Sequence, residues 1–305
     1  MMMSLLRLAA AGLAVILLTG TAVSAHTPLK VHVSILPQKY FVERIAGKLA
    51  MVDVLVQPGK SPATYSPTPD QIHSLAAADV YFRIGVPFEN GFMYKVESLA
   101  PNIKLVDCRQ GIQMRSMAEH VHDHGTEGHD EEHEAHGKQE KTAGKDPHIW
   151  MSPLLVKHQA GIILKTLREL DPDNAPVYNE NYNGFVRDLD MLHQSLSELL
   201  APYKGAALFV FHPAFGYFAD TYGMHQVAVE TMGKAPKGKD LAAIIKQAKK
   251  EKAKVIFVQP QFGSNAAGAI ASAINGHVVS IDPLAYDYLA NMQAIARIIT
   301  RNLAR

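Results

Sequence analysis

The chain has 305 residues, enough for two ordinary domains, and a formal net charge of +1 with its 15 histidines counted as neutral. A charge this close to zero gives no electrostatic basis for binding nucleic acid or an anionic membrane. The single cysteine excludes an intrachain disulfide, so an exported chain of this length would depend on its hydrophobic core.

The first 25 residues have the pattern of a cleavable secretory signal. Arg7 supplies positive charge, Leu8 to Leu18 form a short apolar segment, and Val23-Ser24-Ala25 offer small residues for cleavage near Ala25/His26. The alternative, a membrane span, requires about 20 apolar residues, and this segment is shorter. We therefore predict a soluble, monomeric, periplasmic protein.

Strand and helix patterns alternate through the first half of the mature chain. Short apolar strands are expected over 31–36, 52–56, 80–84 and 103–106, and a helix over 38–48. A second helix starts at Thr68, which caps it, with Pro69 in the first position and Gln71 closing a capping box. This alternation favours βαβ units around a parallel sheet.

A histidine-rich acidic segment, residues 119–145, interrupts this pattern. Such a composition cannot form a packed core, and imidazole suits zinc, copper and nickel. We interpret the segment as a metal-attracting loop, with a merely solvated linker as the alternative. The candidate auxiliary ligands are His120, His122, His124, His129, His133 and His136.

A helix is expected over 154–170 and a longer one over 174–201, which Pro202 ends. The apolar residues of the longer helix recur at steps of three and four, so they share one face. At 1.5 Å per residue this helix would be roughly 40 Å long, enough to join two lobes rigidly. An ordinary core helix of the second lobe is the alternative. The residues on that face are Tyr182, Phe185, Leu189, Leu192, Leu196 and Leu199.

The second half repeats the rhythm of the first. Strands are expected over 207–211, 226–229, 255–258 and 277–281, and helices over 213–222, 241–250, 266–274 and 285–303. The predicted fold class is therefore α/β, with two similar lobes that contain parallel sheets. We divide the chain into an N-terminal lobe over 26–173, a linking helix over 174–203 and a C-terminal lobe over 204–305.

Three residues are candidate ligands of the main metal site. His212 and Asp282 follow directly after predicted strands, and ligands bind beyond the carboxyl ends of parallel strands. His148 stands close to Trp150, the only tryptophan, in a backbone stiffened by prolines. Two imidazoles and a carboxylate can hold a divalent ion between lobes. The alternatives are a neutral buried His212 and an Asp282 that caps a helix beginning at Pro283.

Four motifs carry a resemblance to a known family over nearly the whole mature chain. The chain resembles the periplasmic metal-binding proteins of bacterial ABC importers for zinc and manganese, the zinc uptake protein A family within the cluster A-I solute-binding proteins. This resemblance implies two α/β lobes bridged by one long helix, with the metal between them, and places family ligands at His148, His212 and Asp282. The motifs are Ser61-Pro62-Ala63-Thr64-Tyr65-Ser66-Pro67, Asp146-Pro147-His148-Ile149-Trp150, Phe211-His212-Pro213-Ala214-Phe215-Gly216-Tyr217-Phe218 and Ile281-Asp282-Pro283-Leu284.

One position departs from the family pattern. Where the family usually reads Pro-His-Thr-Tyr, this chain has Pro62-Ala63-Thr64-Tyr65. Alanine has no donor atom, so the first-lobe ligand is missing from its expected place. A loop histidine, a water molecule or a loss of tight binding would each account for the change, and we favour a loop histidine.

The expected function is a periplasmic solute-binding protein that captures Zn²⁺ and passes it to an ABC permease in the inner membrane, without catalysis. Imidazole-rich coordination favours zinc over Mn²⁺, which prefers more oxygen ligands. One alternative is a metal buffer or adhesin that works through the histidine-rich segment. A zinc hydrolase is the other, but the chain has no His-Glu-x-x-His pattern.

Overall fold

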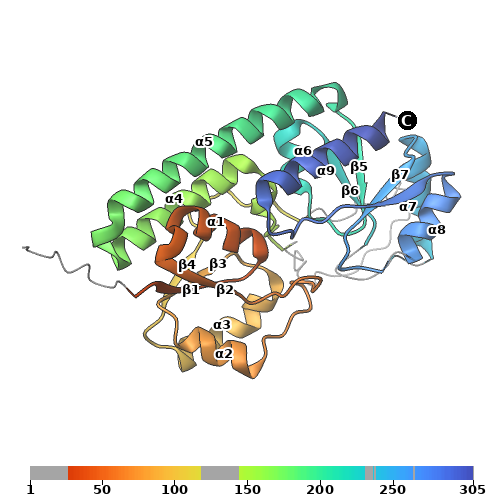
Figure 1. Ribbon diagram of the computed structural model, residues 1–305. Coiled ribbons are helices and arrows are strands. Elements are labelled where there is room, and N and C mark those ends of the chain that lie inside the picture. Colours follow the sequence, from red (N-terminus) through yellow and green to blue (C-terminus); the bar gives the residue numbers. More distant parts are fainter. Residues whose placement is uncertain (1–26, 118–143, 231–235, 237, 264, 305) are drawn as a thin grey trace, which may run out of the picture.

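The computed structural model describes residues 27–117, 144–230, 236, 238–263 and 265–304. Over these ranges the chain forms two lobes, each built around a four-stranded parallel sheet (Figure 1). This arrangement confirms the predicted α/β fold class. The predicted signal and all six auxiliary histidines lie outside the described residues.

The first sheet has the strand order β2-β1-β3-β4. The helix α1 lies on one side of this sheet and α2 and α3 lie on the other (Figure 1). The α2 helix has the expected capping box, in which Gln71 N donates to Thr68 Oγ1 and Thr68 N donates to the Gln71 side chain. The elements are β1 Leu29–Val33, α1 Leu36–Ala46, β2 Ala50–Val54, α2 Pro69–Ala76, β3 Val80–Arg83, α3 Pro87–Leu99 and β4 Lys104–Asp107.

The α3 helix is absent from the elements expected from the sequence. Its signals are Pro87 in the first turn and a buried face that includes Phe88, Phe92 and Val96. The spacing of these three residues, four apart, places them on one side of the helix. With α3 in place, both faces of the first sheet are covered.

The second sheet has the strand order β6-β5-β7-β8. The sequence of the central strand β7 is apolar throughout because both of its faces are buried. Val255 and Phe257 face the main core, while Ile256 and Val258 pack in a separate cluster with α7 and α8. Helices cover both faces, so no position on the strand is polar. The elements are β5 Ala207–Val210, α6 Gly216–Tyr222, β6 His225–Ala228, α7 Lys239–Lys250, β7 Val255–Val258, α8 Asn265–Ala273, β8 His277–Ser280 and α9 Tyr288–Leu303.

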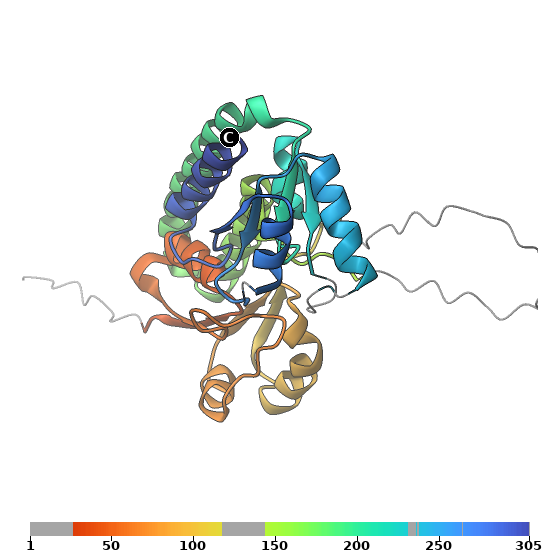
Figure 2. The ribbon, with the colours of Figure 1, turned by 90° about the vertical axis from the view of Figure 1, so that its right-hand side faces the viewer.

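The long helix α5, Ala175–Leu200, contains 26 residues and connects the lobes as predicted. It packs against α1 and α4 (Pro153–Leu170) on one side and against α9, which runs beside it in Figures 1 and 2. The expected apolar face is wrong at one position. Leu199 is 36% exposed, and Leu200 is buried instead, because the inward step from Leu196 is four residues and not three.

The main hydrophobic core is continuous between the lobes. The rings of Phe41 in α1 and Tyr288 in α9 meet edge to face with centroids 5.0 Å apart. Trp150 is buried, and its indole N–H donates to the carbonyl of Pro283 over 2.8 Å. The segment after β8 therefore returns to the first lobe beside His148.

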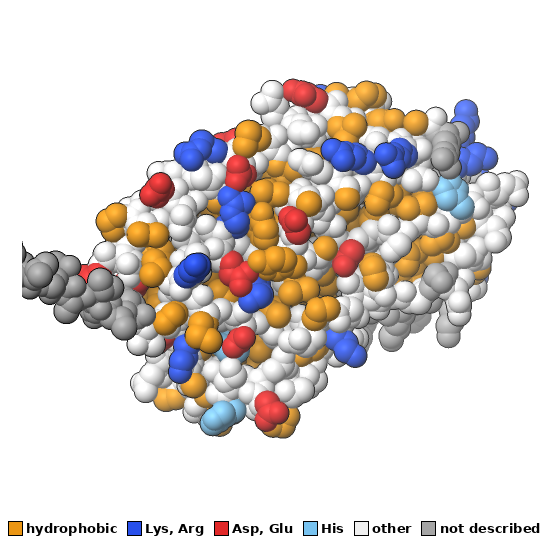
Figure 3. Space-filling model, viewed as in Figure 1, with side chains coloured by type: hydrophobic (Ala, Val, Ile, Leu, Met, Phe, Trp, Pro, Cys, Tyr) orange, Lys and Arg blue, Asp and Glu red, His pale blue; other side chains and the backbone are white. Residues whose placement is uncertain are grey.

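The surface shows no concentration of one charge on the face seen in Figure 3. Lysine and arginine side chains are interspersed there with aspartate and glutamate. No helix in the described ranges is long and apolar enough to cross a membrane.

Candidate metal site

His148 is held by the carboxylate of Asp146, two residues earlier. The backbone N–H of His148 donates to Asp146 Oδ1 over 3.0 Å, and its ring Nδ1 lies 2.7 Å from the same oxygen. The ring packs against Trp150 with centroids 5.0 Å apart, and His148 is only 7% exposed. A carboxylate bonded to Nδ1 fixes the proton there and leaves the Nε2 lone pair for a metal.

His212 is held in the same way by the second lobe. Its Nδ1 is hydrogen-bonded to the buried carboxylate of Glu230, and its ring stacks on Phe262 with centroids 4.8 Å apart. The carboxamide of Gln259 clamps the backbone, accepting from His212 N over 3.1 Å and donating to His212 O over 2.8 Å. The helix expected over 213–222 starts only at Gly216, so His212 lies in the turn after β5.

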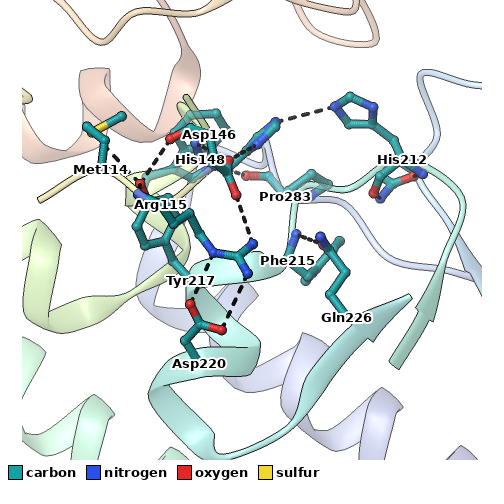
Figure 4. Close-up of polar contacts among 12 residues, drawn as sticks. Met114, Arg115, Asp146, His148, His212, Phe215, Tyr217, Asp220, Gln226 and Pro283 are labelled. Atoms are coloured by element: carbon teal, nitrogen blue, oxygen red, sulfur yellow. Dashed lines mark hydrogen bonds and ion pairs between the residues drawn. The ribbon is translucent and has the colours of Figure 1, made fainter. Parts of the chain in front are cut away.

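The two imidazoles face each other across the lobe interface. The distance between His148 Nε2 and His212 Nε2 is 3.3 Å (Figure 4). Two nitrogens bound to one tetrahedral zinc, each at about 2.0–2.1 Å, lie about 3.3–3.4 Å apart. When both Nδ1 atoms carry protons, the facing Nε2 atoms are two lone pairs with no donor between them, an arrangement that a cation stabilises.

The local electrostatics favour neutral imidazole at His212 and an ionised carboxylate at Asp146. Burial lowers the pKa of His212, and the neighbouring His148 lowers it further, although Glu230 opposes both effects. Burial by itself raises the pKa of Asp146, but His148 and Arg115 together hold that pKa below its ordinary value. Zinc binds neutral imidazole, so His212 is ready for metal near pH 7.

Arg115 connects the carboxylate behind His148 to the second lobe (Figure 4). Its Nη1 donates to Asp146 Oδ2 over 3.2 Å, and its Nε lies 3.1 Å from Asp220 Oδ2 in α6. Gly216 leaves room for this side chain, since a Cβ there would lie 1.5 Å from Arg115 Nη1. Tyr217 of the same helix donates to the carbonyl of Asp146 over 3.0 Å. The orientation of His148 thus depends on contacts between the lobes.

Asp282 precedes two residues that line the cavity, Pro283 and Leu284, and its carboxylate is hydrogen-bonded within the second lobe. Asp282 Oδ1 accepts hydrogen bonds from Gln261 Nε2 and from Leu284 N, both over 2.9 Å. The alternative role as a helix cap is wrong, because α9 begins at Tyr288 and Asp287 caps it. Among the described residues no cluster of three or more His, Cys, Asp or Glu side chains is arranged to hold a metal. Asp282 as a third ligand stays a prediction.

A cavity of about 350 Å³ contains the histidine pair, and Ala63 lines it from the first lobe. The position of the expected first-lobe ligand is therefore at the site and brings no donor atom. Met117 and Gly144, which flank residues 118–143, also line this cavity, and Met117 N donates to Gly144 O over 2.9 Å. The described residues on either side of the histidine-rich segment therefore both lie at the cavity wall.

Two residues that support the site were not identified from the sequence. Glu230 follows the end of β6, and the rule that selected His212 at the end of β5 applies to it equally. Gln259 follows β7 in the same way. Both lie at the carboxyl edge of the second sheet, so topology was the signal that could have found them.

Two α/β lobes joined by one long helix, with paired imidazoles facing each other between them, define a metal-binding solute-binding protein. The family model described as "Zinc-uptake complex component A periplasmic" matches residues 31–302. The chain belongs to this family of zinc-binding transport components, which are not enzymes.

Known relatives cover most of the chain. It is 28% identical over 259 residues to the high-affinity zinc uptake system protein ZnuA of Yersinia pestis, covering 82% of this chain and 81% of that protein. The ZnuA of Bacillus subtilis is 27% identical over 273 residues, which cover 87% of this chain and 81% of the relative.

Solved structures give the same result. A crystal structure of ZnuA matches with 37% identity and a TM-score of 0.80, over 90% of this chain and 99% of that one. A zinc-bound deletion mutant of ZnuA matches with 36% identity and a TM-score of 0.79, over 90% and 98%. The periplasmic zinc-binding protein TroA of Treponema pallidum shares the fold, with 20% identity and a TM-score of 0.77 over 92% and 100%.

Proposed function

We propose that this chain captures Zn²⁺ in the periplasm at His148 and His212 and delivers it to the permease of an ABC importer. The observation that carries this proposal is the 3.3 Å separation of the two Nε2 atoms, each backed by a carboxylate on Nδ1. A periplasmic zinc-uptake family supports both the compartment and the partner. The imidazole ligands bind zinc in their neutral form, so binding requires at most the loss of a proton from a ring and no chemical reaction.

Zinc is the proposed cargo in preference to manganese. Both facing donors are imidazole nitrogens, and the nearest carboxylates, Asp146 and Glu230, are bonded to the far side of the rings. Manganese prefers carboxylate, carbonyl and water oxygens, whereas imidazole suits zinc. Asp282 would join the shell as a third ligand if its carboxylate exchanged the bond with Gln261 for the metal.

Zinc titration by calorimetry tests the site. His148→Ala and His212→Ala should each weaken zinc binding by more than about 100-fold, beyond the range typical for loss of an outer-shell partner. Asp282→Ala should cost less, since a water can replace an oxygen ligand. His225→Ala is the matched control, because His225 pairs with Glu251 on the exposed surface. Wild-type zinc affinity in both site variants would refute the assignment.

A further inference from the structure

The cavity around the histidine pair is larger than a bare ion needs, and much of its wall is apolar. Its volume of about 350 Å³ falls within the range of roughly 300–1,000 Å³ typical of small-molecule pockets. Val86, Trp150, Phe262 and Leu284 contribute apolar surface to it. Polar donor atoms hold a metal ion, whereas apolar walls are complementary to an organic group.

The charged residues that line this cavity are all cationic. Among the described lining residues, Arg109 and Lys145 carry positive charge and none is acidic. Asp146 and Glu230 stand behind the two histidines and are bonded to their Nδ1 atoms. A zinc ion bound to neutral imidazoles would add two further positive charges, so the loaded cavity favours an anionic group.

Arg109 is held in place at the cavity wall. Asp107 accepts from its Nε over 2.9 Å and from its Nη2 over 2.6 Å, which fixes the guanidinium plane and leaves Nη1 outside this pairing. Gly85, with φ +81°, provides the space, since a Cβ there would lie 1.9 Å from Arg109 Nη1. A fixed guanidinium edge is suited to binding a carboxylate.

The coordination of zinc also leaves room for an outside donor. His148 and His212 supply two of the usual four positions, and Ala63 supplies none. Even with Asp282 as a third ligand, at least one position remains open. A bound small molecule would fill it without any ordering of the chain.

We propose that the cavity accepts zinc together with a small organic chelator that bears a carboxylate, such as an amino acid. The chelator donates one or two atoms to the zinc held by His148 and His212, and its carboxylate pairs with Arg109, with Lys145 at the rim. This inference rests on the proposed function and specifies the form in which the zinc arrives.

The test compares two chelators that differ only in the carboxylate. L-Histidine and histamine both chelate zinc through an amine and an imidazole, but histamine has no carboxylate. Zinc titrations buffered to the same free Zn²⁺ concentration should give about tenfold tighter apparent binding with L-histidine, the effect of one charge-assisted pair. Native mass spectrometry should detect a complex of protein, zinc and L-histidine, and a less abundant corresponding complex with histamine at the same concentrations.

Variants assign the effect to the cavity. Arg109→Gln should remove the advantage of L-histidine and leave binding of zinc alone unchanged, while Arg168→Gln, on the exposed surface of α4, should behave as wild type. Lys145→Gln should reduce the advantage of L-histidine over histamine in part. Because Lys145 is exposed, this variant also tests the proposal if Arg109→Gln does not fold.

The outcomes separate this inference from the proposed function. Tight binding of zinc alone with no difference between the chelators would overturn the chelate proposal and leave the zinc site standing. An advantage of L-histidine that survives in both Arg109→Gln and Lys145→Gln would also overturn it. Failure to bind zinc with or without a chelator would refute the proposed function itself.

Discussion

At the scale of single residues, each histidine of the facing pair has a carboxylate behind it. Asp146 bonds His148 Nδ1 and Glu230 bonds His212 Nδ1, so the two Nε2 atoms are directed at one point between the lobes. Such outer partners fix the tautomer and raise the basicity of the ligand nitrogen. The two carboxylates therefore belong to the proposed zinc site although they lie on the far side of the rings.

We expect Glu230→Gln to lower zinc affinity by about 10–100-fold, because an amide can bond either tautomer and no longer fixes the lone pair on His212 Nε2. Glu251→Gln is the matched control, since Glu251 also pairs with a histidine, His225, over 3.4 Å, and neither residue lines the cavity. Competition titrations against a chromophoric zinc chelator measure both variants. Equal affinities for the two would show that the Glu230 contact has no role.

The buried side chain of His32 should make the stability of the fold depend on pH in a way that does not involve the metal. It is 4% exposed, its Nε2 lies 3.1 Å from Ser74 Oγ, and burial lowers its pKa below the ordinary 6.5, although Asp53 partly opposes this. The unfolded state therefore takes up the proton first as pH falls through 6.5. Stability should decrease from that pH down to the lowered folded pKa.

Replacing this histidine should remove its share of the acid sensitivity. Urea unfolding of the metal-free protein at pH 8 and pH 5.5 should show a smaller loss of stability in His32→Gln than in the wild type. His212 titrates in both proteins, so its contribution cancels in the comparison. An identical pH dependence would mean that the buried His32 ring does not control it.

At the scale of elements, the long helix α5 transmits packing from one lobe to the other. Phe185 on its buried face meets the rings of Tyr40 and Phe41 in α1, with centroids 6.1 and 5.9 Å away. The helix also packs against α9, which belongs to the second lobe. A rigid helix with both lobes packed along it keeps His148 and His212 in register.

Phe185→Ala should reduce the free energy of unfolding by about 3–5 kcal/mol, because it removes a fully buried ring and leaves a cavity. Met191→Ala changes the same helix at a position that is 62% exposed and should stay within about 0.5 kcal/mol of the wild type. Chemical denaturation followed by circular dichroism measures both. Similar losses in the two variants would argue against a special role for the buried face.

The elements also show how far the sequence allowed the fold to be predicted. Apolar periodicity predicted the long helix and all eight strands of the described ranges, because both faces of each sheet are covered and the pattern is strong. It missed α3, and it placed Leu199 inside, since a step of three or four cannot be distinguished without the neighbouring helix. His148 and His212 followed from local pattern and topology. The same topological rule selects Glu230 as a residue at the sheet edge, but its hydrogen bond to His212 joins the ends of two strands and is displayed only by the folded chain.

At the scale of the whole molecule, the site is assembled from segments far apart in the sequence. His148 precedes α4, His212 follows β5, and Ala63 belongs to the loop before α2. Arg115 links the segment that contains His148 to α6, because it pairs with both Asp146 and Asp220. The loops of the first sheet contribute a wall to the cavity but no donor atom from the side chain at position 63, so the proposed zinc site depends on donors from elsewhere.

The last prediction concerns this position and the histidine-rich segment in buffer free of small chelators. Ala63→His should raise zinc affinity, because an imidazole at the cavity wall needs little ordering on binding. A histidine from residues 119–136 would instead have to lose backbone freedom at about 1–2 kcal/mol per ordered residue. If that segment supplies the missing donor in the wild type, deleting 119–136 should weaken zinc binding in the wild type and matter much less after Ala63→His.

Zinc titrations of the wild type, the deletion, Ala63→His and the combined variant form a double-mutant cycle. Equal costs of the deletion in both backgrounds would show that segment and position 63 are uncoupled, and the donor at the open position would then be a water or a bound small molecule.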